Sequence, residues 1–145
     1  MPTAQQVLAQ KGSQVFNTSP SATVLDAALL MNEHKIGCLI VLDNGCIVGI
    51  FTERDVLRRV VARRLDPGET LVGDVMTREV VCCEPDATVD DARNVVMHRR
   101  IRHLPIVDAQ GQLLGLISIG DLNAWELTGQ EIELQALHEY IHSRV

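Results

Sequence analysis

Hydrophobic and polar residues follow one another in an order that predicts a helix and then a hairpin. Val24, Ala27 and Met31 have helical spacing, and they come after Thr23, a residue type that suits a helix N-cap. The apolar runs CLIVL and CIVGIF follow, with a turn-forming Asp-Asn-Gly between them at residues 43–45. Because both runs are almost continuously apolar, we expect strands that are covered on both faces.

The same order of elements recurs later in the chain. Residues 21–43 align with residues 86–108 at an offset of 65, and one inserted residue near Gln110 changes the offset to 66. The segment GIFTERD, residues 49–55, then matches GLISIGD, residues 115–121. Each copy reads as a short strand, a helix, two strands and a second helix. The sequence therefore predicts an α+β fold of two tandem β-α-β-β-α repeats.

The pattern also predicts where these units begin and end. We place repeat 1 at residues 7–66, a linker at 67–72 that follows the break at Asp66, repeat 2 at 73–128, and an amphipathic helix at 129–145. A unit of about 60 residues buries a smaller share of its surface than a body of twice that size. We therefore expect the two copies to pack together around a pseudo-twofold axis.

Composition limits the partners of this chain. Its formal charge of -6 and its pI of about 5.3 argue against broad attraction to nucleic acid or to an anionic membrane. We find no stretch of roughly 20 apolar residues and no secretory signal pattern, so we expect a cytoplasmic protein. The four cysteines form no C-x-x-C pair and lie in strand-like runs, which favours reduced, buried thiols over a metal site.

The repeated motif has two interpretations. A hydroxyl residue followed three places later by a carboxylate, as in Thr52 and Asp55, is a helix start signal. It also suits a nucleotide: Gly49 would let a ligand approach the backbone, and a helix N-terminus would offer unpaired N–H groups to a phosphate. The Thr52 hydroxyl would then donate to the phosphate, while the Asp55 carboxylate accepts from ribose hydroxyls.

Basic residues cluster beside this motif. Eight of the 13 Lys and Arg lie in residues 54–64 and 99–102 of an otherwise acidic chain. A solvated helix face accounts for Arg58, Arg59, Arg63 and Arg64. For Arg54, Arg102 and His103, which adjoin turns beside the motif, we favour contact with a phosphate.

Together the two segments IGCLIVLDNGCIVGIFTERDVLRRVV and VMTREVVCCEPDATVDDARNVVMHRRIRHLPIVDAQGQLLGLISIGDL resemble a CBS domain pair, or Bateman module. The match extends from about residue 7 to about residue 127 and is similar to the small stand-alone bacterial members. The resemblance implies a regulatory sensor without catalysis that binds adenosine ligands between its copies: AMP, ADP, ATP, NAD or S-adenosylmethionine. It also implies a homodimer and an effector protein that the sequence does not identify.

The resemblance assigns roles to particular residues. Asp55 and Asp121 would hold ribose, and Thr52, Arg54, Ser118 and Gly120 would face phosphate. The base would lie against the first strands and the segments that precede the hairpins, which adds Thr18, Ile36, Gly37, Cys38, Val80, Arg102, His103, Leu104 and Pro105. Repeat 1 has Ile40 in the place of Pro105. We therefore expect the base pocket of repeat 2 to be the better formed, with Arg54 reaching its phosphate.

Two other functions remain open. An interaction module with degenerate clefts would need the motif only as a helix cap. A zinc hydrolase would use HEYIH, residues 138–142, whose two histidines lie on one helix face with Glu139 as base. A catalytic zinc needs a third protein ligand, and only three residues follow, so we favour an amphipathic helix there and expect no metal. We find no nucleophile elbow and no Walker loop.

Overall fold

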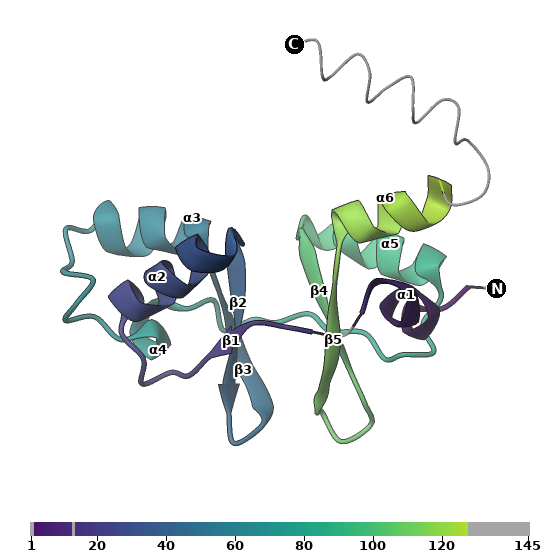
Figure 1. The fold of residues 1–145 in the computed structure, drawn as a ribbon, viewed down its shortest axis with the longest axis horizontal. Helices are drawn as coiled ribbons and strands as arrows, with labels where there is room; N and C mark the ends of the chain where they lie inside the picture. Colours follow the sequence, from purple (N-terminus) through teal and green to yellow (C-terminus); the bar gives the residue numbers. More distant parts are fainter. Residues whose placement is uncertain (1, 13, 128–145) are drawn as a thin grey trace, which may run out of the picture.

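The computed structural model describes residues 2–12 and 14–127, and it forms two lobes that lie side by side (Figure 1). The first lobe contains a three-stranded sheet in the order β1 (Asn17–Thr18), β2 (Cys38–Asp43), β3 (Cys46–Thr52). Strand β1 is parallel to β2, and β2 is antiparallel to β3. The helix α2 (Val24–His34) connects β1 to β2, and α3 (Glu53–Asp55) follows β3 and continues as the π-helix η1 (Val56–Val61).

The second lobe repeats this arrangement, but its sheet has two strands instead of three. Helix α5 (Val89–Arg99) precedes the antiparallel pair β4 (His103–Val107) and β5 (Leu113–Ser118), and α6 (Ile119–Leu127) follows. In place of a first strand there is one parallel bridge, between Cys83 and Ile106. The predicted α+β fold of two β-α-β-β-α repeats is confirmed, with first strands shorter than the sequence indicated.

Each lobe receives a helix from the segment that precedes the other repeat. Helix α1 (Ala4–Lys11) packs in the second lobe, where Thr3 bridges to Thr88, and α4 (Val72–Val75) packs in the first lobe, where Leu71 bridges to Thr23. Figure 1 shows the chain crossing between the lobes after α1 and crossing back after α4. The repeat boundaries at residues 7–66 and 73–128 remain predictions. Each lobe nevertheless contains a helix that precedes the other repeat in the sequence, so the lobes do not coincide with continuous segments of the chain.

The two hydrophobic cores follow this exchange. The first core joins residues of α2, β2 and β3 to Val72, Val75 and Met76 of the α4 segment. The second joins residues of α5, β4 and β5 to Ala4, Val7 and Leu8 of α1. Neither core is closed by its own repeat alone.

The motif glycines make room for these exchanged helices, so the expectation that Gly49 opens the backbone to a ligand is wrong. A Cβ atom at Gly49 would lie 2.6 Å from Met76 Sδ and 2.8 Å from the Thr77 carbonyl oxygen. A Cβ atom at Gly115 would lie 2.6 Å from Leu8 Cδ2. What approaches the strand at each glycine is the protein's own chain.

The predicted helix starts are present. The Thr23 and Thr88 hydroxyls accept from the backbone N–H groups of Asp26 and Asp91, at 3.1 and 3.0 Å. At the repeated motif, Asp55 N–H donates to Thr52 Oγ1 at 3.2 Å, and Asp121 N–H donates to Ser118 Oγ at 3.1 Å. The capping interpretation of the motif is therefore correct, whatever else the aspartates do.

Candidate functional site

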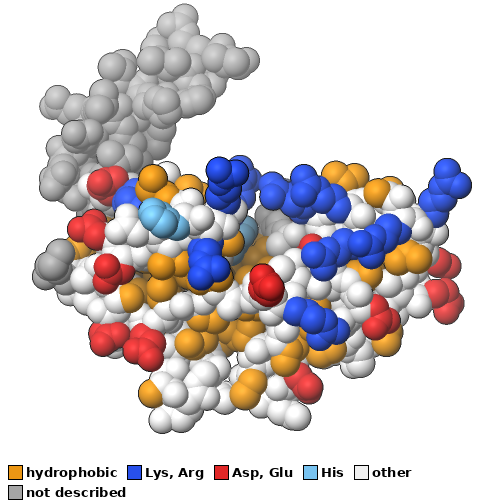
Figure 2. All heavy atoms as spheres, turned by 180° about the vertical axis from the view of Figure 1, so that it is seen from behind, with side chains coloured by type: hydrophobic (Ala, Val, Ile, Leu, Met, Phe, Trp, Pro, Cys, Tyr) orange, Lys and Arg blue, Asp and Glu red, His pale blue; other side chains and the backbone are white. Residues whose placement is uncertain are grey.

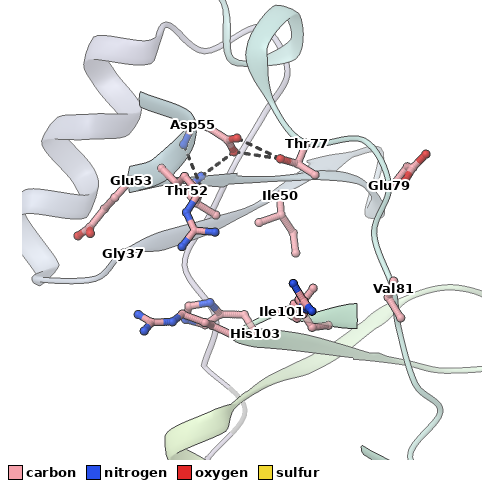
Figure 3. Close-up of a pocket in the computed structure, with 13 residues that line it drawn as sticks. Gly37, Ile50, Thr52, Glu53, Asp55, Thr77, Glu79, Val81, Ile101 and His103 are labelled. Atoms are coloured by element: carbon pink, nitrogen blue, oxygen red, sulfur yellow. Dashed lines mark hydrogen bonds between the residues drawn. The ribbon is translucent and has the colours of Figure 1, made fainter. Parts of the chain in front are cut away.

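A cavity of about 360 Å³ lies between the lobes (Figure 3). Repeat 1 contributes the end of β3 and the motif, repeat 2 contributes the segment that enters β4, and the connection after α4 closes one side. The lining residues are Gly37, Ile50, Thr52, Glu53, Arg54, Asp55, Thr77, Glu79, Val81, Arg100, Ile101, Arg102 and His103. This volume lies within the range of about 300–1,000 Å³ that is typical of small-molecule sites.

One wall of the cavity is the carboxylate of Asp55, a residue that is 6% exposed. Its Oδ2 atom accepts from the backbone N–H of Thr52 at 3.1 Å, and the Thr77 hydroxyl lies 3.1 and 3.2 Å from its two oxygens (Figure 3). Arg59 Nε is 3.7 Å from Oδ1. Since a carboxylate has about four acceptor positions, hydroxyl groups of a ligand still have a place to bind.

Three exposed arginines line the same cavity. Arg54 follows the motif in repeat 1, while Arg100 and Arg102 come from the turn before β4 in repeat 2. Among the described residues, none of these guanidinium groups has a hydrogen-bond or ion-pair partner. Figure 2 shows Lys and Arg side chains gathered along the upper part of one face. Unpaired guanidinium groups at a cavity are suited to a phosphate, which they bind in bidentate geometry.

His103 lies on the opposite wall from Asp55, beside Ile101 (Figure 3). Burial lowers the pKa of this imidazole from its ordinary value, and the charges of Lys11 and Arg102 lower it further, while Asp121 opposes the shift. These effects favour the neutral form of the imidazole. Ile50, Val81 and Ile101 supply apolar surface to the same space, as the face of a base requires.

The backbone N–H groups at the motif are less available than the sequence indicated. Glu53 N–H donates to the Gly37 carbonyl at 3.0 Å, and Ile119 N–H donates to the Arg102 carbonyl at 3.0 Å. The N–H groups of Asp55 and Asp121 are taken by the capping hydroxyls. The expectation of a helix N-terminus with unpaired N–H groups is therefore corrected: an anion in this cavity must rely mainly on arginine side chains.

The structure brings six of the candidate site residues together and separates the others. Gly37, Thr52, Arg54, Asp55, Arg102 and His103 line the cavity. Cys38, Leu104 and Pro105 are buried, and burial raises the pKa of the Cys38 thiol to about 11. Ile36 lines a separate hollow beside α2, and the cavity lining does not include Thr18, Val80, Ser118, Gly120 or Asp121.

Sequence reasoning missed several lining residues. Thr77 and Glu79 belong to the connection between the repeats, whereas Val81 lies in the predicted first strand of repeat 2, residues 80–83, which was expected to complete the base pocket. Arg100 belongs to the basic cluster at residues 99–102 but was not singled out. Thr77 had no signal in the motif comparison, because its role depends on the exchange of α4 into the first lobe.

The second motif has a different environment. Lys11, at the end of α1, donates from Nζ to Asp121 Oδ2 at 2.5 Å and to the Leu116 carbonyl at 2.6 Å. Ser118 N–H donates to Asp121 Oδ2 at 2.8 Å. Burial by itself would raise the pKa of Asp121, but the hydrogen bonds from Lys11 and Ser118 outweigh it and hold that pKa below its ordinary value.

The segment HEYIH, residues 138–142, which was considered as a zinc site, lies outside the described residues, as does the predicted helix at 129–145. Within residues 2–12 and 14–127, no group of three or more His, Cys, Asp or Glu side chains is placed to hold a metal ion. In the same part of the chain no helix has the length and apolar character needed to cross a membrane.

The fold and the cavity define a class of protein: a pair of tandem α+β repeats with a small-molecule site between them. A family model described as CBS domain matches residues 13–62 and again residues 72–126. The chain therefore belongs to the CBS domain family, and the resemblance found in the sequence is confirmed.

Relatives cover most of the chain. The CBS domain-containing protein YhcV of Bacillus subtilis is 36% identical over 118 residues, which are 81% of this chain and 83% of the relative. The solved structure of a protein with CBS domains from Burkholderia ambifaria is 38% identical, with a TM-score of 0.83, and covers 90% of this chain and 97% of its own. The sequence of CBSX2, whose structure was solved in complex with AMP, is 26% identical to this chain. The two structures match with a TM-score of 0.73 over 88% of this chain and 97% of the CBSX2 chain.

Proposed function

We propose that this protein is a regulatory sensor without catalysis, which binds an adenosine nucleotide such as AMP or ATP in the cavity beside Asp55. The observation that carries the proposal is the combination of groups in one space of about 360 Å³. A buried carboxylate for ribose, three unpaired arginines for phosphate and three apolar side chains for a base lie around the same cavity. The AMP complex of CBSX2, a relative with the same fold, supports the choice of ligand.

Each part of the ligand has a partner in this arrangement. The ribose hydroxyls donate to Asp55, and the Thr77 hydroxyl rotates to share that carboxylate. The phosphates lie toward Arg54, Arg100 and Arg102, with His103 as a further donor once it is protonated. Because these cations come from both repeats, one bound nucleotide connects the two lobes. NAD, which carries two phosphates and a second ribose, would use the same groups.

Calorimetric titration of adenosine, AMP, ATP and NAD tests this proposal. We expect AMP and ATP to bind more tightly than adenosine, since only they engage the arginines. The Arg102→Gln variant should lose most of this preference while it still binds adenosine. Asp55→Asn should weaken every ligand by about tenfold or more, since a charge-assisted hydrogen bond is worth about 1.5–3 kcal/mol. Arg58→Gln, on the helix after the motif and outside the cavity lining, is the matched control.

Two results would contradict the proposal. Absence of binding at millimolar nucleotide would leave Asp55 as a helix cap and favour an interaction module. Equal affinity for adenosine and AMP would show that the arginines do not bind the phosphate.

We further propose that the chain forms a homodimer through the outer helices of the first lobe. Leu25 and Leu29 of α2 are 44% and 57% exposed, and Leu57 and Val61 of η1 are 60% and 61% exposed. Within each pair the two residues are four positions apart, so each pair lies on one side of its helix. Sedimentation of the wild type and of a Leu29→Glu, Leu57→Glu variant tests this: the variant should be a monomer. An unchanged mass would place the interface elsewhere.

A further inference from the structure

The two motif aspartates meet different partners at the same place in their repeats. At the first motif, Thr77 donates its hydroxyl to Asp55 and its backbone N–H to the Ile50 carbonyl, at 2.9 Å. At the second, the single ammonium group of Lys11 donates both to Asp121 and to the Leu116 carbonyl. Ile50 and Leu116 are equivalent, because they pair with Ile40 and Pro105, which differ by the repeat offset of 65. One lysine therefore satisfies the two acceptors that Thr77 satisfies in the first repeat.

This replacement changes what a ligand meets. A threonine hydroxyl is neutral and rotates, so it shares a carboxylate with incoming hydroxyl groups. An ammonium at 2.5 Å from Asp121 Oδ2 forms a charge-assisted hydrogen bond, which is stronger than a neutral one and has to be broken or displaced before ribose hydroxyls take its place. The Lys11 and Asp121 side chains are 31% and 25% exposed, so water screens this pair only in part.

We propose that Lys11 acts as an internal occupant of the second motif, so that each chain binds one nucleotide, at Asp55, and the second position stays closed to it. This inference rests on the proposed function and adds the number of sites and the residue that sets it. It agrees with the cavity, whose lining includes Thr52 and Asp55 but neither Ser118 nor Asp121. The lowered pKa of Asp121 is a second consequence of the same contact.

The test counts AMP molecules per chain by equilibrium dialysis, with calorimetry for affinity, on the complete protein. Lys11→Met keeps an unbranched side chain of similar length and removes the charge, and Lys11→Arg, the matched control, keeps the charge. We expect one AMP per chain for the wild type and for Lys11→Arg, and two for Lys11→Met. The second AMP should disappear again in Lys11→Met, Asp121→Asn, while the first remains. Thermal melts verify that each variant is folded.

The outcomes separate this inference from the proposed function. One AMP per folded chain of both the wild type and Lys11→Met overturns the role of Lys11 and leaves the Asp55 site intact. Two AMP molecules per wild-type chain, with one lost in Lys11→Met, make Lys11 a phosphate contact and also overturn it. Binding by Lys11→Met alone, with none by the wild type, supports Lys11 as occupant and refutes the Asp55 site. Absence of AMP from every variant refutes both.

Discussion

Gly49→Ala tests the exchange of helices between the lobes most directly. The new Cβ atom would lie 2.6 Å from Met76 Sδ and 2.8 Å from the Thr77 carbonyl oxygen. The sulfur can move, but the oxygen belongs to a backbone that is fixed to Ile50 by two hydrogen bonds of 2.9 Å. Overpacking costs about 1–3 kcal/mol, and each backbone hydrogen bond that the shift weakens adds up to about 1 kcal/mol. We expect the free energy of unfolding to fall by about 2–4 kcal/mol.

Gly115→Ala is the matched comparison, because its Cβ atom would meet only the flexible end of Leu8, with Cδ2 at 2.6 Å. We expect a smaller loss of about 1–2 kcal/mol. Leu8→Ala should cost less in the Gly115→Ala background than in the wild type, since it removes the atoms in conflict. Urea unfolding measures the wild type and all four variants. The packing described for α1 and α4 would be refuted by a Gly49→Ala protein within about 0.5 kcal/mol of wild type, the range of neutral surface changes.

Three further predictions concern titration and thiol reactivity. The pKa of His103 is lowered by burial and by nearby cations, so an AMP phosphate beside the imidazole should raise it, and binding should take up protons near pH 6.5, measured by calorimetry in two buffers. The His103→Gln variant should take up fewer protons; an uptake equal to that of the wild type would show that the imidazole is not the group that is protonated. The lowered pKa of Asp121 stabilises the fold above its ordinary value of 3.8, and this contribution is lost as pH falls below it. The Lys11→Met variant should therefore be less stable than the wild type at neutral pH, and the difference in their free energies of unfolding should become smaller as pH falls, measured by urea unfolding at several pH values. A difference that stays constant with pH would contradict a stabilising ion pair. A thiol reagent should modify the exposed Cys46 before the buried Cys38, and the Cys46→Ser variant, which lacks the first of these thiols, is the control. Labelling of Cys38 before Cys46 would argue against the burial of Cys38.

Much of the fold could be predicted from periodicity and internal repetition. The alignment of residues 21–43 with 86–108 gave the helices and hairpins of both lobes, and the hydroxyl residues Thr23 and Thr88 gave their starts. The site was predicted less completely. Arg54, Arg102 and His103 were found from local charge beside turns, and they do line the cavity. Leu104 and Pro105 were placed at its surface by resemblance, yet they lie in a strand that the lobe buries.

The correction at Gly49 and the missed role of Thr77 share one physical cause, which is the path of the chain between the repeats. Aligning the two repeats of the sequence matches each motif with its copy. The alignment does not show which other segment of the chain packs against each motif in the fold. Gly49 looked like an opening for a ligand because the helix segment that fills the space beside it precedes the opposite repeat, and Leu8 of α1 fills the space beside Gly115 in the same way. Thr77 and Lys11 lie at or just beyond the ends of those two helices, and they decide what the motif aspartates can accept. Two motifs that match in sequence therefore differ in chemistry, since the residues that distinguish them lie outside the repeated pattern.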